Sequence, residues 1–227
     1  SYVPVPLIEA IHARGIPVLQ VYGSTETCPI AIYQRAEDAF DNVGSTGKPA
    51  LHCEVRVVDE AGVDVPDGVS GEILVRGPSV MYEYWGNEAA TEQSLRDGWF
   101  FTGDIGYRGE NGYYFINDRK KDMVISGGEN IYPAELEVVL NGMAEIKQAA
   151  VVGRDDEKWG QVPVAVVVRV EGASIDKQTI LDRFNGVLAR FKHPKDVVFM
   201  DAMPTNVMGK IQKFTLRTHV NEIHLVK

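Results

Sequence analysis

The sequence predicts an α/β and α+β protein with three parts. Residues 1–42 resemble the tail of a doubly wound sheet, 43–121 a small β-rich, distorted barrel-like subdomain, and 122–227 a separate α+β C-terminal domain. Three observations predict this: a helix–strand unit opens the chain, short strands with tight turns follow, and strands then alternate with helices. We expect the boundary at Lys121, inside a run of charged residues.

The first part is predicted to be a helix over 4–14, which Gly15 ends, and then an apolar strand over 17–22. The loop 23–27 after this strand is small and polar, and α/β sheets usually bind ligands at such positions. Apart from Gln20, 18–22 is apolar, like a strand from the inside of a parallel sheet, yet no partner strands precede it in the sequence. We therefore expect an unpaired apolar edge.

The second part is predicted to contain short strands joined by turns. Asn111-Gly112 is the strongest hairpin signal in the chain. Asn87 is a suitable N-cap for a helix that continues to about Leu95, and Asp97-Gly98 turns the chain into the next strand. The expected strands are 54–58, 71–76, 99–102 and 113–117.

The third part is predicted to alternate strands and helices over about 105 residues, which is enough for a small domain. Pro133 suits the first position of a helix, and Asp176 begins another that we expect to continue to about Leu188. The expected strands are 123–126, 148–152, 162–170 and 196–200, and the expected helices are 133–140, 176–188 and one after Lys213.

Composition excludes several classes of function. The formal net charge is −9, with a pI near 5.1, so the chain lacks the basic balance of a nucleic-acid-binding protein. The longest apolar run, Val162–Val168, is broken by Pro163 and is too short for a membrane span. The two cysteines cannot form a disulfide framework, so we expect a cytoplasmic location. The five histidines lack the spacing of zinc ligands.

The loop YGSTET at 22–27 is the first candidate site. Gly23 would let a ligand approach the backbone, Ser24 and Thr25 offer hydroxyls to a phosphate, and Glu26 offers the oxygen that Mg²⁺ prefers. A polar loop after a buried strand explains the same residues equally well. The segment GSTGKP at 44–49 lacks the spacing of a Walker-type phosphate loop and is predicted to be a turn.

Five further residues have a functional and a structural interpretation. Asp104, in a glycine-flanked turn, could hold a ribose or cap the turn. Arg119 lies in a charged run that is either a hinge or a solvated face. Gly127-Gly128 would permit a ligand to pass closely, and Lys210 could neutralise a phosphoryl group or lie free in solvent.

Five segments taken together, in their order, resemble the AMP-forming acyl-CoA synthetases of the adenylate-forming superfamily. They are YGSTET at 22–27, GEILVRGPSVMYEYW at 71–85, DGWFFTGDIG at 97–106, DRKKDMVISGGENIYPAELE at 118–137 and PTNVMGKIQK at 204–213. The resemblance covers nearly the whole chain. It implies that 1–121 is the C-terminal part of the large adenylate-forming domain and 122–227 the small mobile domain.

The resemblance implies nucleotide-binding roles in the first two parts. Tyr22 would stack on adenine, with Gly23 in the same nucleotide loop. Thr25 would contact the α-phosphate, and the resemblance makes it a catalytic residue together with Glu26, which would hold Mg²⁺. Asp104 and Arg119 would bind the ribose hydroxyls.

The resemblance also implies roles in the third part. Lys121 would be the hinge between half-reactions, Gly127 and Gly128 would line the CoA pantetheine tunnel, and Lys210 would be the nucleotide-binding and catalytic lysine of adenylation. Two positions depart from the pattern: Ile125 stands where some ligases have Lys, and Asn130 where others have Gln or Arg.

The implied function is an ATP-dependent, AMP-forming ligase that joins a carboxylic acid to CoA, and the wording of the motifs favours a fatty or other hydrophobic acid. Its small-molecule partners would be the acid, ATP and CoA, with Mg²⁺ as cofactor; a homo-oligomer stays open. The family's phosphate loop, of the form TSGTTGxPKG, is not in the sequence. We therefore expect the C-terminal two-fifths of an enzyme, inactive by itself. A nucleotide-binding module and an enzyme that loads a carrier protein are the alternatives.

Overall fold

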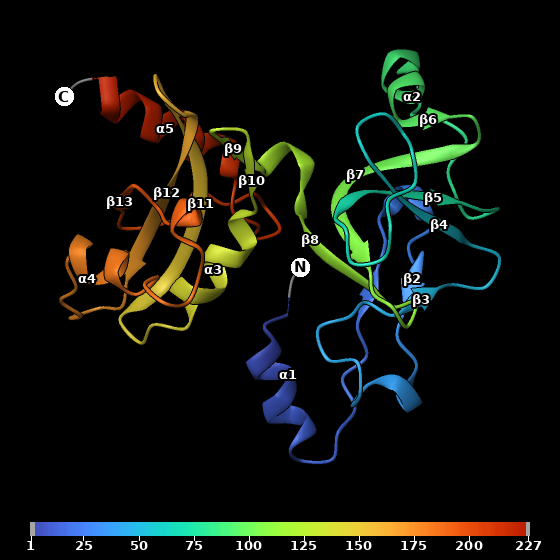
Figure 1. The fold of residues 1–227 in the computed structure, drawn as a ribbon, viewed down its shortest axis with the longest axis horizontal. Coiled ribbons are helices and arrows are strands. Elements are labelled where there is room, and N and C mark those ends of the chain that lie inside the picture. Colours follow the sequence, from blue (N-terminus) through green and yellow to red (C-terminus); the bar gives the residue numbers. More distant parts are fainter. Residues whose placement is uncertain (1–2, 226–227) are drawn as a thin grey trace. The chain divides into compact units, whose positions relative to one another are not determined.

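The computed structural model describes residues 3–225 and divides the chain into two compact units, Ser1–Lys120 and Lys121–Lys227 (Figure 1). The helices are α1 (Val5–His12), α2 (Glu88–Ser94), α3 (Pro133–Asn141), α4 (Lys177–Asp182) and α5 (Lys213–Leu225). Four short 3-10 helices are η1 (Thr25–Thr27), η2 (Ala36–Asp38), η3 (Lys120–Asp122) and η4 (Arg190–Lys192).

The strands of the first unit are β1 (Val21–Tyr22), β2 (Ile32–Tyr33), β3 (Lys48–Pro49), β4 (Glu54–Val58), β5 (Gly71–Arg76), β6 (Leu95–Arg96), β7 (Trp99–Arg108) and β8 (Tyr114–Arg119). Those of the second unit are β9 (Val124–Ser126), β10 (Glu129–Ile131), β11 (Ile146–Asp156), β12 (Gly160–Arg169) and β13 (Asp196–Phe199).

The first unit contains two antiparallel sheets. A small sheet has the order β1-β2-β3, and a five-stranded sheet has the order β4-β5-β7-β6, with β8 also paired to β7. Two predicted turns are confirmed, since Asn111-Gly112 leads into β8 and Asp97-Gly98 joins β6 to β7 with positive φ at both residues. The Asn87 side chain caps α2 by accepting from the amide of Ala90 at 3.1 Å.

The segment before the first candidate loop differs from the expectation. The strand predicted over 17–22 is reduced to β1, and its described partner β2 is antiparallel. Leu19 and Val21 have 47% and 56% of their surface exposed, which agrees with an apolar strand that lacks its parallel-sheet partners. The expectation that this edge is unpaired is wrong, because β2 pairs with β1 in the antiparallel direction.

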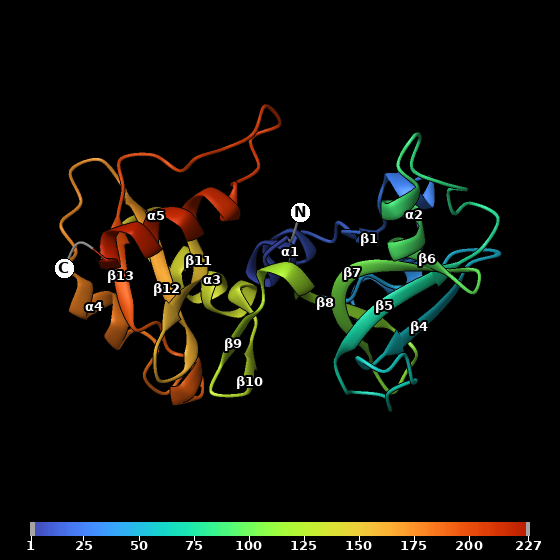
Figure 2. The same cartoon turned by 90° about the horizontal axis from the view of Figure 1, so that it is seen from above.

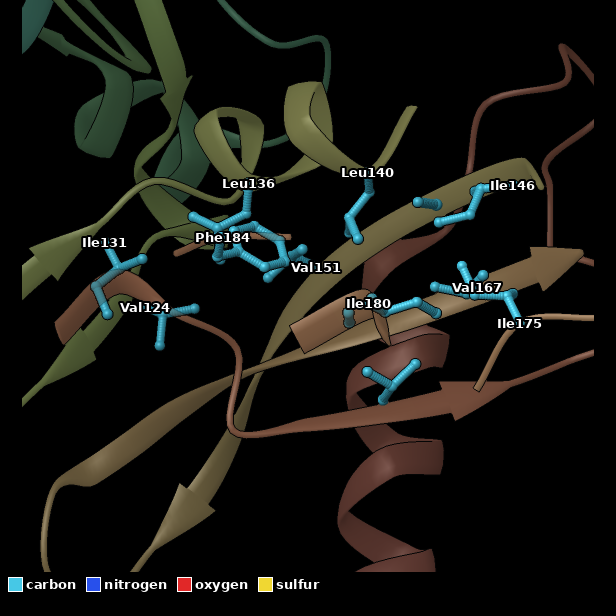
Figure 3. Packing of buried hydrophobic residues seen from close by; sticks show 13 residues of the cluster. Val124, Ile131, Leu136, Leu140, Ile146, Val151, Val167, Ile175, Ile180 and Phe184 are labelled. Carbon is cyan, nitrogen blue, oxygen red and sulfur yellow. The ribbon is translucent and has the colours of Figure 1, made fainter. Parts of the chain in front are cut away.

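The second unit is a five-stranded sheet in the order β10-β9-β12-β11, in which β13 adds to β12 in parallel. Alternate residues of β11 enter different cores: Ala149 and Val151 pack with α3 and α4, whereas Ala150 and Val152 pack with α5. Figure 3 shows Val151 among the side chains of the first core, and Figure 2 shows α5 beside the sheet. Both faces of this sheet are therefore covered.

Helix α4 is shorter than predicted. Asp176 caps it as expected by accepting from the amide of Thr179 at 2.7 Å. After Asp182 the chain continues in turns, with the amide of Asn185 bonded to the Asp182 carbonyl, and Gly186 has a φ of 75°. A residue in this left-handed region ends a helix, which is why the pattern does not continue to Leu188.

The described part of the chain contains no helix that is long and apolar enough to cross a membrane. The predicted mixture of α/β and α+β structure is confirmed by these elements.

Candidate active site

Three of the predicted nucleotide-binding residues lie in direct contact. The Tyr22 hydroxyl donates a hydrogen bond of 2.7 Å to Oδ2 of Asp104, and the Arg119 Nε lies 2.6 Å from Oδ1 of the same carboxylate. Residue 22 ends β1, whereas Asp104 and Arg119 are directly opposed on β7 and β8. The fold thus brings together residues up to 97 positions apart in the sequence.

Burial and charge act on this cluster in opposite directions. Only 9% of the Asp104 side chain is exposed, against 53% for Arg119. Burial raises the pKa of Asp104 above its usual value, against the hydrogen bond from Tyr22 and the charge of Arg119, which lower it. Burial and the neighbouring Asp104 carboxylate likewise raise the pKa of Tyr22, so the phenol stays a hydrogen-bond donor. The exposed guanidinium leaves polar groups available for ligand hydroxyls, next to the buried carboxylate.

Local chain geometry explains why Asp104 faces the other two residues. Between the pairs Glu72–Ile105 and Leu74–Phe101, β7 contains two more residues than β5, so it bulges at 102–104. Gly103 has a φ of 69° and the Thr102 hydroxyl bonds to the Ile73 carbonyl at 2.7 Å, which holds the bulge. Bulges redirect side chains in this way.

Glu26 forms a second group with a residue that we did not predict. Its Oε1 accepts a hydrogen bond of 2.9 Å from the Tyr84 hydroxyl, and its backbone carbonyl accepts from the amide of Met81 at 2.8 Å. Burial opposes ionisation of Glu26, but hydrogen bonds from the backbone and from Tyr84 and the charge of Arg119 lower its pKa. Tyr84 lies within the motif GEILVRGPSVMYEYW, which was the available signal.

An ionised, partly exposed carboxylate suits Mg²⁺, which binds oxygen and is often held by one or two carboxylates together with substrate phosphates. Among residues 3–225 there is no group of three or more His, Cys, Asp or Glu side chains that could hold a metal without a substrate. Glu26 fits the role of a single protein ligand, and Thr25 beside it is exposed.

The interpretation of Gly23 changes with the structure. A Cβ at this position would lie 1.8 Å from the Pro29 carbonyl oxygen, so the chain itself occupies the space next to Gly23. The glycine is required for the tight turn around η1, in which the Thr27 hydroxyl accepts from the amide of Ser24 at 2.9 Å. Close approach of a ligand is not needed to explain it.

The glycine pair of the second unit forms a tight hairpin. Gly127 and Gly128, with φ of 61° and 87°, connect the paired residues Ser126 and Glu129. The amide of Gly127 donates to the Trp159 carbonyl at 2.8 Å, and a Cβ on Gly127 would lie 2.7 Å from the Trp159 ring. Gly128 has open space beside it. Trp159 is a neighbour that sequence reasoning missed, because it comes from the distant β11–β12 turn.

Lys210 and Lys121 also lie in the second unit. Lys210 is exposed in a loop that Asn206 holds, because the Asn206 Oδ1 accepts from the amides of Met208 and Lys210 at 3.0 and 2.9 Å. Lys121 lies in η3, where its carbonyl accepts a hydrogen bond of 3.0 Å from Arg217 of α5.

Comparisons with known proteins identify two matching family models and several relatives. The family described as "AMP-binding enzyme" matches residues 2–85, and "AMP-binding enzyme C-terminal domain" matches residues 135–210. The chain is 51% identical to indoleacetate–CoA ligase of Aromatoleum aromaticum over 217 residues, which are 96% of this chain and 42% of that protein. It is 43% identical to 2-succinylbenzoate–CoA ligase of Bacillus cereus over 220 residues, which are 97% and 45% of the two chains.

Solved structures show the same similarity. The o-succinylbenzoate CoA synthetase (MenE) from Bacillus subtilis, in complex with the acyl-adenylate intermediate OSB-AMP, aligns with a TM-score of 0.89 and 38% identity over 94% of this chain and 44% of that one. ATP-bound MatB from Rhodopseudomonas palustris aligns with a TM-score of 0.88 and 38% identity over 97% and 44%. The chain spans less than half the length of these relatives. The fold, the five motifs and the matches place this chain in the family of AMP-binding, adenylate-forming enzymes.

Proposed function

We propose that this chain is part of an ATP- and Mg²⁺-dependent, AMP-forming ligase that joins an aromatic carboxylic acid to CoA. The observation that carries the proposal is the contact of Asp104 with both Tyr22 and Arg119, a buried carboxylate and an exposed guanidinium held on facing strands. This arrangement suits the paired hydroxyls of a ribose, which need an acceptor and a donor side by side.

The choice of acid rests on the relatives. Two relatives are named for aromatic acids, indoleacetate and 2-succinylbenzoate. The chain is 51% and 43% identical to them and covers 42% and 45% of their lengths. The sequence motifs favoured a fatty or other hydrophobic acid, and the fatty acid finds no support in these names. We therefore propose an aromatic acid.

The reaction would proceed in two steps. A carboxylate oxygen of the acid attacks the α-phosphorus of ATP and pyrophosphate leaves, which forms the acyl-adenylate. The CoA thiol, as it loses its proton, then attacks the acyl carbon, and AMP leaves as the thioester forms. Both steps depend on positioning and on charge stabilisation more than on covalent chemistry of the protein.

Residues of the first unit would bind the nucleotide. Asp104 and Arg119 would hold the ribose, Tyr22 would fix Asp104 while its ring stacks on the adenine, and Thr25 would contact the α-phosphate. Glu26 would bind Mg²⁺, which supplies positive charge to the phosphate oxygens when bound. Tyr84 would orient that carboxylate through its 2.9 Å hydrogen bond.

Residues of the second unit would act in separate steps. Lys210 would stabilise the charge that develops at the α-phosphate, and Gly127-Gly128 would line the path of the pantetheine arm. Lys121 would be the hinge about which the second unit turns between the two steps, so that Lys210 acts in the first step and Gly127-Gly128 in the second. Proline restricts φ, so Lys121→Pro should spare adenylation and impair thioester formation.

An exchange assay tests the proposal. In the complete protein we expect ATP–pyrophosphate exchange that depends on indoleacetate or another aromatic acid and on Mg²⁺, followed by a CoA thioester. The panel should include 2-succinylbenzoate and octanoate as the aromatic and aliphatic comparisons. Exchange with octanoate alone would contradict the aromatic assignment, and thioester formation on a carrier protein but not on CoA would contradict the ligase assignment.

A further inference from the structure

Glu72 is a buried carboxylate that contacts strand β7 and the residue that follows strand β8. Only 11% of its side chain is exposed. Its Oε1 accepts a hydrogen bond of 3.2 Å from the amide of Gly103, and its Oε2 lies 2.8 Å from the Lys120 ammonium. Gly103 directly precedes Asp104, and Lys120 directly follows Arg119. One carboxylate therefore contacts the chain neighbour of each member of the pair.

The bulge in β7 explains why a carboxylate is needed at this point. The two extra residues of β7 take the Gly103 amide out of the regular ladder with β5. An amide that is shielded from water and has no acceptor destabilises the fold. Glu72 pairs with Ile105 next to the bulge, and its side chain supplies the acceptor for the Gly103 amide. A second irregularity lies in β8, between the pairs Ile105–Asp118 and Gly106–Ile116. Asp104 and Arg119 are thus paired next to irregularities in both β7 and β8.

We propose that Glu72 is a positioning residue for nucleotide binding. Its carboxylate ties the bulge of β7 to the end of β8 and so holds Asp104 and Arg119 opposite each other before the ribose arrives. This inference rests on the proposed function, and it extends it to a residue that does not itself contact the nucleotide.

Substitutions of Glu72 and of Lys120 separate the two contacts of the Glu72 carboxylate, the hydrogen bond from the Gly103 amide and the ion pair with Lys120. Glu72→Gln keeps an oxygen for the Gly103 amide and removes the charge that Lys120 requires. Lys120→Met removes the same ion pair from a partly exposed side chain and leaves the bulge intact, whereas Lys120→Arg retains a cation. Glu54→Gln is the matched control, because it breaks the exposed ion pair of Glu54 with Arg76 (2.6 Å) in the same sheet.

The first measurement is independent of turnover. In the complete protein we expect Lys120→Met and Glu72→Gln each to weaken AMP binding by about tenfold, measured by calorimetry, with faster hydrogen exchange at the amides of residues 103 and 119. Lys120→Arg and Glu54→Gln should bind AMP as the unsubstituted protein does. Unchanged AMP affinity in both Lys120→Met and Glu72→Gln would overturn the proposal.

The second measurement is kinetic. The KM for ATP should rise about tenfold in Lys120→Met, with the KM for the acid unchanged, and the double variant Glu72→Gln/Lys120→Met should be no worse than the more affected single variant. An equal loss for ATP and for the acid, or additive losses in the double variant, would indicate general destabilisation and overturn the positioning role. If the unsubstituted protein forms no adenylate with any acid, the proposed function fails, and the calorimetry and exchange experiment still decides the role of Glu72.

Discussion

Asp104 and Arg119 are directly opposed on β7 and β8, with 2.6 Å between the carboxylate Oδ1 and the guanidinium Nε. The hydroxyl of Tyr22 reaches the other oxygen of the same carboxylate. The Asp104 side chain is buried and the Arg119 side chain is half exposed, so only the guanidinium is open to solvent. This asymmetry suits a binding site for a polar ligand.

Asp104→Asn should weaken nucleotide binding. The amide still accepts a hydrogen bond from Tyr22, but it loses the charge that holds Arg119 in place. We expect the Kd for AMP to rise by about tenfold or more, measured by calorimetry, because hydrogen bonds to charged groups contribute roughly 1.5–3 kcal/mol. Asp64→Asn, which breaks the exposed pair with Arg56, is the control and should leave the Kd unchanged. Equal affinity in Asp104→Asn and the unsubstituted protein would refute the ribose assignment.

Tyr84→Phe should raise the Mg²⁺ concentration needed for half-maximal adenylation. The change removes the hydroxyl that orients the Glu26 carboxylate and lowers its pKa, and loss of such an orienting partner costs about 10-fold in metal affinity. Tyr82→Phe is a closely matched control, since Tyr82 lies two residues away and is 98% exposed. A shift of equal size in both variants would show that Glu26 is not oriented by Tyr84. Removal of Mg²⁺ by a chelator should stop adenylation in all three proteins.

Lys210→Ala should lower the rate of adenylate formation by about 10²–10³-fold, which is the usual effect of one preorganised charge-stabilising group. Thioester formation from pre-made acyl-adenylate should change much less. Asn206→Ala should reproduce a smaller part of the loss, because Asn206 holds the loop by accepting from the Lys210 amide at 2.9 Å. Lys147→Ala, an exposed lysine on β11, is the control. Equal losses in both half-reactions would contradict the assignment of Lys210.

Asp196 should make the stability of the second unit depend on pH. Burial opposes ionisation, but the 2.9 Å contact with Lys177, the Val197 amide and Arg154 together lower the pKa of Asp196 below its model-compound value of 3.8. A carboxylate whose pKa is lower in the folded state stabilises the fold above the unfolded pKa, and this contribution is lost as pH falls through the folded value. Asp196→Asn should therefore reduce the free energy of unfolding at pH 7, and the difference from the unsubstituted protein should become smaller as the pH falls below 3.8 towards the folded pKa.

Urea unfolding at pH 7, 5 and 3 measures this difference. Asp182→Asn, which changes an exposed carboxylate at the end of α4, is the control in the same unit. A difference between Asp196→Asn and the unsubstituted protein that is the same at pH 7 and pH 3 would contradict the prediction.

Local signals in the sequence were sufficient for most elements and for the choice of candidate residues. Turn pairs such as Asn111-Gly112, the cap Asn87 and the helix start at Pro133 act within a few residues, so they are visible without tertiary context. The motifs that carry Tyr22, Asp104 and Arg119 were likewise visible as short segments. The sequence by itself therefore determined the fold class, the family resemblance and the choice of Tyr22, Asp104 and Arg119 as candidates, but not that of Tyr84.

Only the tertiary structure decided how these residues meet. The contacts of Asp104 with Tyr22, and of Glu72 with Lys120, join positions 82 and 48 residues apart, and no local pattern encodes such pairings. The same is true of Gly23, whose missing side chain makes room for the Pro29 carbonyl, and of Trp159, which packs against Gly127. Strand register and bulges set these distances, because a shift of one residue would turn each side chain to the opposite face of its sheet.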